Sequence, residues 1–90
     1  MISKKVIIKG KVQGVYFRDY TMRQAVSLGL TGWVRNLPDG SVEALLCGDR
    51  EKISSMLNWF RTGSPRSRVD KVIVEDVEAD ESHTSFTVRY

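Results

Sequence analysis

Apolar and charged residues alternate along the first stretch of the chain. The apolar positions are Val6, Ile8 and Val12, and the positions between them include Ile7, Lys9 and Lys11. A period of two places successive side chains on opposite faces of an extended backbone. The pattern therefore predicts a strand over residues 4–12 that buries one face.

Two shorter stretches predict a hairpin. Residues 31–36, which include Trp33 and Val34, and residues 41–47 both favour strands. The sequence between them, residues 37–40, reads Leu-Pro-Asp-Gly. In such a turn the proline fixes its own φ angle, and the glycine adopts the positive φ that other residues would adopt only with strain.

Two stretches have helical spacing instead. A helix over residues 18–28, ending at Gly29, carries an apolar stripe. The stripe consists of Met22, Ala25, Val26 and Leu28. A second helix begins after Asp49, a typical N-cap residue, and stops at Gly63 and Pro65. Its apolar residues follow the i, i+3, i+4, i+7 pattern and are Ile53, Met56, Leu57 and Phe60.

The order of these elements defines a fold class. Residues 69–77 and 86–90 predict a fourth strand and a short fifth one, so the order is β-α-β-β-α-β plus a terminal strand. This order predicts an α+β, ferredoxin-like split β-α-β sandwich, with an antiparallel sheet covered on one face by two helices. Such a fold does not by itself assign a function.

Length and composition limit the possibilities. The 90 residues fit one domain, residues 1–90, with 41% hydrophobic and 28% charged residues. A net charge of +3 suits a small anionic ligand at least as well as a nucleic acid. Cys47 is the only cysteine, and no stretch is long and apolar enough for a signal or a membrane span, so we expect a cytoplasmic protein.

The segment GKVQGVYFR, residues 10–18, joins the first strand to the first helix. A loop before a helix N-terminus presents unpaired backbone N–H groups, and Gly14 lets that backbone curl. Arg18 adds a planar fork of donors that matches a phosphate edge. These nine residues alone are equally compatible with an ordinary glycine turn followed by a solvated arginine.

A second segment, GWVRNLPDGSVEALLCG over residues 32–48, places Asn36 at the end of a strand, where its carboxamide could face the same edge of the sheet. Together the two segments closely resemble the two signature motifs of the acylphosphatase family. The resemblance continues through GSPRSRVDK, residues 63–71, and SFTVRY, residues 85–90, and so covers essentially the whole chain.

The resemblance implies hydrolysis of the carboxyl-phosphate bond of acyl phosphates to a carboxylate and inorganic phosphate. Arg18 would hold the phosphoryl group together with the amides of the loop, and Asn36 would orient the attacking water. The loop residues are Gln13, Gly14, Val15, Tyr16 and Phe17. Positioning and preorganised donors can supply most of the catalysis of phosphoryl transfer. The substrate's own phosphate can take the proton from water, which removes the need for a protein base.

Partners and ligands follow from the same reasoning. We expect an acyl phosphate as substrate, inorganic phosphate or sulfate as competitive ligands, a monomer, and neither a membrane nor a nucleic acid as partner. No cofactor is expected, and no divalent metal, because one histidine, one cysteine and scattered carboxylates do not make a ligand cluster. The identity of the natural acyl group does not follow from the sequence.

Two other functions fit part of the sequence. RNA-recognition modules share the element order, but they need exposed aromatic residues on the central strands, and the predicted central strands, the first and the third, have none. A sensor that binds phosphate without turnover is disfavoured only by Asn36, whose position suits a water.

Other reactive residues have simpler structural explanations. We expect His83 in a solvated loop, Cys47 as a small buried side chain, and both Trp33 and Trp59 as core or groove walls. An acidic run is expected to be a solvated edge and hairpin tip. It comprises Glu75, Asp76, Glu78, Asp80 and Glu81.

Overall fold

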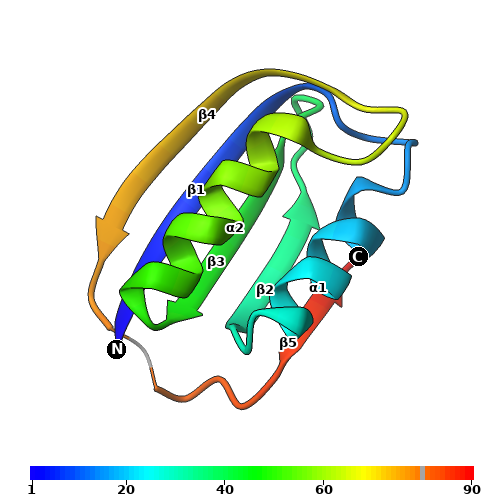
Figure 1. The fold of residues 1–90 in the computed structure, drawn as a ribbon. Helices are drawn as coiled ribbons and strands as arrows, with labels where there is room; N and C mark the ends of the chain where they lie inside the picture. Colours follow the sequence, from blue (N-terminus) through cyan, green and yellow to red (C-terminus); the bar gives the residue numbers. More distant parts are fainter. Residues whose placement is uncertain (80) are drawn as a thin grey trace.

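The elements follow one another as the sequence predicts. A computed structural model describes residues 1–79 and 81–90, and over these the chain forms the strands and helices shown in Figure 1. They are β1 (Ile2–Lys11), α1 (Phe17–Ser27), β2 (Thr31–Asn36), β3 (Val42–Gly48), α2 (Arg50–Thr62), β4 (Arg68–Val77) and β5 (Phe86–Arg89).

The strands form one sheet in the order β4-β1-β3-β2-β5. The first four strands pair antiparallel, as predicted, and β1 and β3 are central. The prediction of an antiparallel sheet holds for these four strands but not for β5, which pairs parallel with β2. Strand β5 lies at the edge of the sheet opposite β4 and runs in the same direction as β2 (Figure 1). The sheet is therefore mixed, and both helices lie on the same face of it.

The core lies between this sheet face and the two helices. The alternation predicted for β1 is confirmed, because Val6 and Ile8 are fully buried. They pack against residues of the other strands and of both helices, including Val34, Val42, Ala44, Leu46, Phe17, Ala25, Ile53, Met56 and Phe60. Trp59 and Phe60 lie close to Phe17, with ring centroids 5.8 Å and 6.0 Å from it. Helix α2 thereby supports the residue at which α1 begins.

The apolar stripe predicted for α1 is partly wrong. Val26 is 57% exposed, whereas the buried residues of the helix are Phe17, Thr21 and Ala25. These follow at intervals of four and lie on one face, and Val26 is turned about 100° away from Ala25. Thr21 is fully buried in this row, and the hydropathy pattern does not predict this because threonine is polar.

Both helix ends lie close to their predicted positions. After α1, Gly29 has φ 71°, its N–H bonds to the Val26 carbonyl, and the N–H of Leu30 bonds to the Ala25 carbonyl. These two bonds form a Schellman motif, which needs the left-handed backbone that glycine adopts without strain. Asp49 is the N-cap residue of α2, as predicted, although no side-chain capping bond is formed.

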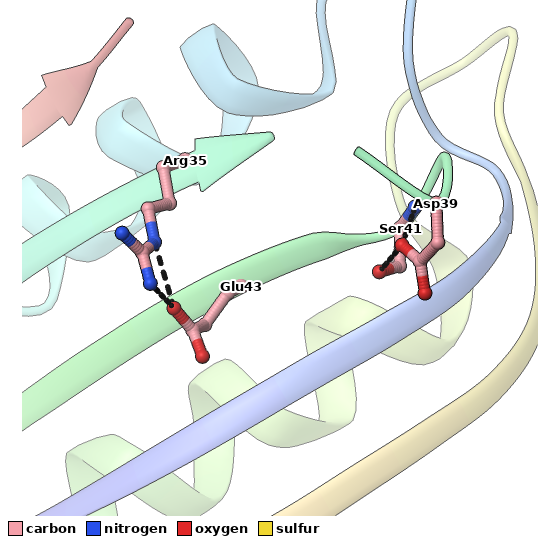
Figure 2. Close-up of polar contacts among 4 residues, drawn as sticks. All are labelled: Arg35, Asp39, Ser41 and Glu43. Atoms are coloured by element: carbon pink, nitrogen blue, oxygen red, sulfur yellow. Dashed lines mark hydrogen bonds and ion pairs between the residues drawn. The ribbon is translucent and has the colours of Figure 1, made fainter. Parts of the chain in front are cut away.

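The β2–β3 hairpin is stabilised by polar side chains (Figure 2). At its tip the Asp39 carboxylate accepts hydrogen bonds from the Ser41 backbone N–H, 3.0 Å away, and from the Ser41 hydroxyl. Further along, Arg35 and Glu43 face each other in register, and Arg35 Nη2 lies 2.6 Å from Glu43 Oε1. Glu43 is only 7% exposed, so its charge needs this partner.

The remaining residues of interest lie away from the helix-covered core. Cys47 is fully buried, as predicted, and its sulfur accepts a hydrogen bond from the Ser3 hydroxyl at 3.1 Å. Trp33 is also buried, and His83 lies between β4 and β5. The acidic run begins on the exposed edge strand β4, where Glu75 and Asp76 lie, and includes Asp80, which lies outside the described residues.

Candidate active site

A pocket of about 430 Å³ opens where β1 passes into α1, at the end of the sheet where β2 and β5 finish. Its walls come from three segments that are distant in sequence, residues 12–19, Asn36 and residues 88–90. They are lined by Val12, Gln13, Gly14, Tyr16, Phe17, Arg18, Asp19, Asn36, Val88 and Tyr90. All the residues predicted for the site line this pocket except Val15.

The loop before α1 has an unusual backbone. Gly14 has φ 74° and Tyr16, the N-cap of α1, has φ 59°. Left-handed φ values are rare for residues other than glycine and cost on the order of 1–3 kcal/mol. Two such residues on either side of Val15 curl the backbone into a concave loop ahead of the helix N-terminus. Turns of this kind collect N–H groups toward an anion.

Neighbouring segments hold this loop in place. Val15 is buried, and its carbonyl accepts a hydrogen bond from the Ser64 hydroxyl at 3.0 Å. The first backbone bond of α1 runs from the Tyr20 N–H to the Tyr16 carbonyl. The N–H groups that precede it in the first helical turn therefore have no acceptor within the helix.

Arg18 is oriented by the end of the chain. Its Nη1 donates a hydrogen bond to the Arg89 carbonyl at 3.0 Å, and its guanidinium carbon lies 4.6 Å from the centre of the Tyr90 ring. A cation over an aromatic face is attracted by the ring quadrupole. The positive charge is thus held at the pocket wall by groups that the sequence motif around Arg18 does not contain.

Asn36 enters the pocket from the end of β2. It pairs with Val42, which is fully buried under the helices, so both side chains lie on the helix-covered face of the sheet. Its Oδ1 atom is shielded from solvent and has no hydrogen-bond partner among residues 1–79 and 81–90. An unpartnered buried acceptor costs about 1–3 kcal/mol, so its presence at a pocket is a sign of function.

Gln13 connects the two halves of the site. Its side-chain nitrogen lies 2.8 Å from the Leu37 carbonyl and 2.8 Å from the Ser41 carbonyl. These carbonyls stand on either side of the hairpin turn that follows Asn36. The sequence predicts Gln13 only as a residue of the phosphate-binding loop, and this use of its carboxamide has no signal in the local pattern.

The charges around the pocket leave Arg18 as its main cation. Asp19, which also lines the wall, is paired with Arg23 one turn along α1, at 3.0 Å. On the nearby hairpin, hydrogen bonds from the Ser41 hydroxyl and backbone N–H lower the pKa of Asp39 below its usual 3.8. Over residues 1–79 and 81–90, no three side chains of the metal-ligating types gather at one place. The two helices of that same part of the chain are too short and too polar to cross a membrane.

The geometry describes a class of site: a concave backbone loop at a helix N-terminus, one arginine, and one carboxamide with a buried, unused acceptor. Such an arrangement binds a tetrahedral anion and can place a water beside it. A small α+β protein with this pocket is suited to phosphoryl transfer.

Comparison with known proteins identifies the family. The acylphosphatase family profile matches residues 4–88. An acylphosphatase of Rhizorhabdus wittichii is 53% identical over 75 residues, which are 83% of this chain and 76% of that protein. One of Caldivirga maquilingensis is 48% identical, with 99% of this chain and 95% of that protein covered. The crystal structure of acylphosphatase from Bacillus subtilis superposes with a TM-score of 0.96 at 36% identity, covering 100% of both chains.

The chain belongs to the acylphosphatase family. Its activity is that of the family, hydrolysis of acyl phosphates, and the predicted fold class and activity are confirmed. The RNA-binding and sensor alternatives are not favoured.

Proposed function

We propose that Arg18 and the backbone amides of residues 13–17 hold the phosphoryl group of an acyl phosphate, while Asn36 orients the attacking water. The observation that carries this division is that Asn36 lines the same pocket as Arg18 from a different segment, with a carboxamide oxygen that has no hydrogen-bond partner among residues 1–79 and 81–90. A carboxamide can accept a hydrogen bond from a water or donate one to it, so Asn36 can orient a water beside the phosphoryl group.

The reaction then needs little beyond positioning. The water oxygen forms a bond to phosphorus, the bond from phosphorus to the carboxylate oxygen breaks, and its electron pair leaves with the carboxylate. The proton of the water passes to an oxygen of the phosphoryl group, and inorganic phosphate forms. Arg18 and the loop amides stabilise the negative charge on the equatorial oxygens in the transition state.

We propose that this reaction proceeds without a divalent metal. The support is electrostatic: the guanidinium of Arg18 and the N–H groups of the helix start already provide positive charge where a metal would otherwise stand. For the same reason inorganic phosphate and sulfate should compete with substrate, because the loop recognises the tetrahedral anion rather than the acyl group.

The remaining parts of the proposal concern the protein in the cell. We propose a cytoplasmic monomer that acts on small acyl phosphates and binds neither membrane nor nucleic acid. The lone buried Cys47 is compatible with a reducing compartment. The central strands β1 and β3 carry none of the aromatic residues on which RNA bases stack.

The direct test is hydrolysis of benzoyl phosphate, followed by its loss of absorbance on addition of the purified protein. We expect turnover that survives excess chelator and is competitively inhibited by inorganic phosphate. Phosphate binding without turnover would identify a sensor, and recovery of a chelated preparation only by Mg²⁺ or Zn²⁺ would contradict metal independence. Inhibition that is purely noncompetitive would count against the loop as the phosphoryl site.

A further inference from the structure

The Gln13 carboxamide is tied to the hairpin that bears Asn36. Its Nε2 lies at hydrogen-bonding distance, 2.8 Å, from two carbonyl oxygens, those of Leu37 and Ser41. A carboxamide nitrogen has two N–H donors, so this arrangement uses both of them. The side chain is partly buried and bridges 24 residues of sequence in one contact and 28 in the other.

The two acceptors are the carbonyls that close the turn. The Leu37 carbonyl also accepts from the Gly40 N–H at 3.2 Å, and the Ser41 carbonyl from the Leu37 N–H at 2.8 Å. Gln13 therefore adds a contact from the phosphate loop to a turn that already closes on itself. Leu37 is the residue directly after Asn36, so the contact fixes the backbone at the point where the Asn36 side chain leaves it.

We propose that Gln13 is a positioning residue, whose side chain sets the placement of Asn36 relative to the phosphoryl loop. This inference rests on the proposed role of Asn36 as the residue that orients water. A phosphoryl group and its water must be aligned closely, and a displacement of about 1 Å can cost on the order of a hundredfold in rate. A rigid link between the two segments that hold them preserves that alignment.

The bond pattern separates this role from that of a phosphate ligand. Both side-chain donors of Gln13 point at backbone carbonyls, so they are not free for an anion. Loss of the link should move Asn36 and leave the loop amides and Arg18 in place. The rate constant kcat should then fall while the affinity for inorganic phosphate is kept.

The test uses Gln13→Leu, which keeps the size of the side chain but removes both donors, and Gln13→Glu, which turns a carboxylate toward two carbonyls. We expect kcat for benzoyl phosphate to fall about tenfold in Gln13→Leu, on the scale of a lost hydrogen bond, and further in Gln13→Glu. Phosphate affinity, measured by thermal protection, should stay within about twofold of wild type. Gln24→Leu makes the same change on α1 outside the pocket and should leave both quantities unchanged.

A double mutant shows whether Gln13 acts through Asn36. In an Asn36→Ala background, Gln13→Leu should lower kcat by less than about twofold, because the group that it positions is gone. A full tenfold loss in that background, or a loss of phosphate affinity, would overturn the proposal. Absence of turnover in the wild type would instead refute the proposed function itself, so the two failures are distinct.

A measurement on the wild-type protein does not depend on how the variants fold. In an NMR titration with inorganic phosphate, backbone N–H signals of residues 13–17 should shift, and the Gln13 side-chain amide signals should change little. Side-chain signals that shift as much as those of the loop would make Gln13 a phosphate ligand and overturn the proposal.

Discussion

The guanidinium of Arg18 is joined to the last strand by a hydrogen bond from Nη1 to the Arg89 carbonyl, 3.0 Å long. The Tyr90 ring lies under the same group at 4.6 Å. Arg18 is the second residue of the first helix and Arg89 ends the fifth strand, so two parts of the chain that are 71 residues apart build one wall of the pocket. The fork of donors is therefore already oriented before an anion arrives.

Removal of this fork should weaken phosphate binding and turnover together. We expect Arg18→Ala to lose about 1.5–3 kcal/mol of phosphate affinity, the scale of one charge-assisted contact, and more at the transition state. Arg18→Lys should also be poor, because a lysine keeps the charge without the planar fork. Thermal protection by phosphate and benzoyl phosphate kinetics measure the two effects.

Arg50→Ala is a matched control for Arg18, since Arg50 lies at the start of α2, at the other end of the sheet from the pocket. It should leave both measurements unchanged. If Arg18→Ala bound phosphate as tightly as the wild type, Arg18 would not be a phosphate-binding residue.

Replacement of Asn36 should separate rate from affinity. If Asn36 orients only the water, Asn36→Ala should lower kcat by on the order of a hundredfold or more and leave phosphate affinity nearly unchanged. Kinetics with benzoyl phosphate and phosphate-dependent unfolding give both numbers. Asn58→Ala, on the exposed side of α2, is the control. Full activity in Asn36→Ala, or a loss of phosphate binding as severe as that of Arg18→Ala, would show that the assigned role is wrong.

The left-handed conformation of Tyr16 predicts an unusual order of stabilities. Its side chain is 75% exposed, so a substitution removes few contacts, and the backbone dominates the effect. We expect Tyr16→Gly to keep or raise the free energy of unfolding, by up to about 1 kcal/mol, because glycine relieves the strain at φ 59°. Tyr16→Val should lower it by about 1–2 kcal/mol, since a β-branched residue fits this region least well. Urea unfolding of both variants tests this, and equal stabilities would mean that the curled loop does not persist in solution.

The stability of the protein should depend on pH through Asp39, at the tip of the hairpin. Its pKa is lowered by hydrogen bonds from the Ser41 hydroxyl and backbone N–H, so the folded state favours the carboxylate. The resulting stabilisation is fully present above the ordinary pKa of 3.8 and is lost as the pH falls through the lower value in the folded protein. Wild type should therefore unfold at a higher temperature than Asp39→Asn at neutral pH, and the gap should narrow below about pH 4. A gap that stays constant down to pH 2 would show that the charge of Asp39 contributes nothing.

The elements, their order and the location of the site are properties that local sequence could predict. Period-two alternation in β1 and the i, i+3, i+4, i+7 spacing in α2 are imposed by backbone geometry, which holds whatever the neighbours are. The same is true of the glycine after α1 and of Arg18 at a helix start. Asn36 could be placed at a strand end for this reason, and its side chain then lines the pocket as expected.

Tertiary structure alone decided which surfaces meet. Nothing in the local pattern of α1 says that Thr21 is buried while Val26 faces solvent, because that depends on the rotation of the helix over the sheet. The parallel pairing of β5 with β2, and with it the contact from Arg89 to Arg18, depends on where the chain crosses after β4. The two carbonyls that Gln13 reaches belong to a turn formed far along the chain, and a carboxamide shows no partner until the fold brings one within 3 Å. Local sequence determines conformation through short-range sterics and hydrogen bonds, whereas these contacts exist only once the strands and helices have packed together.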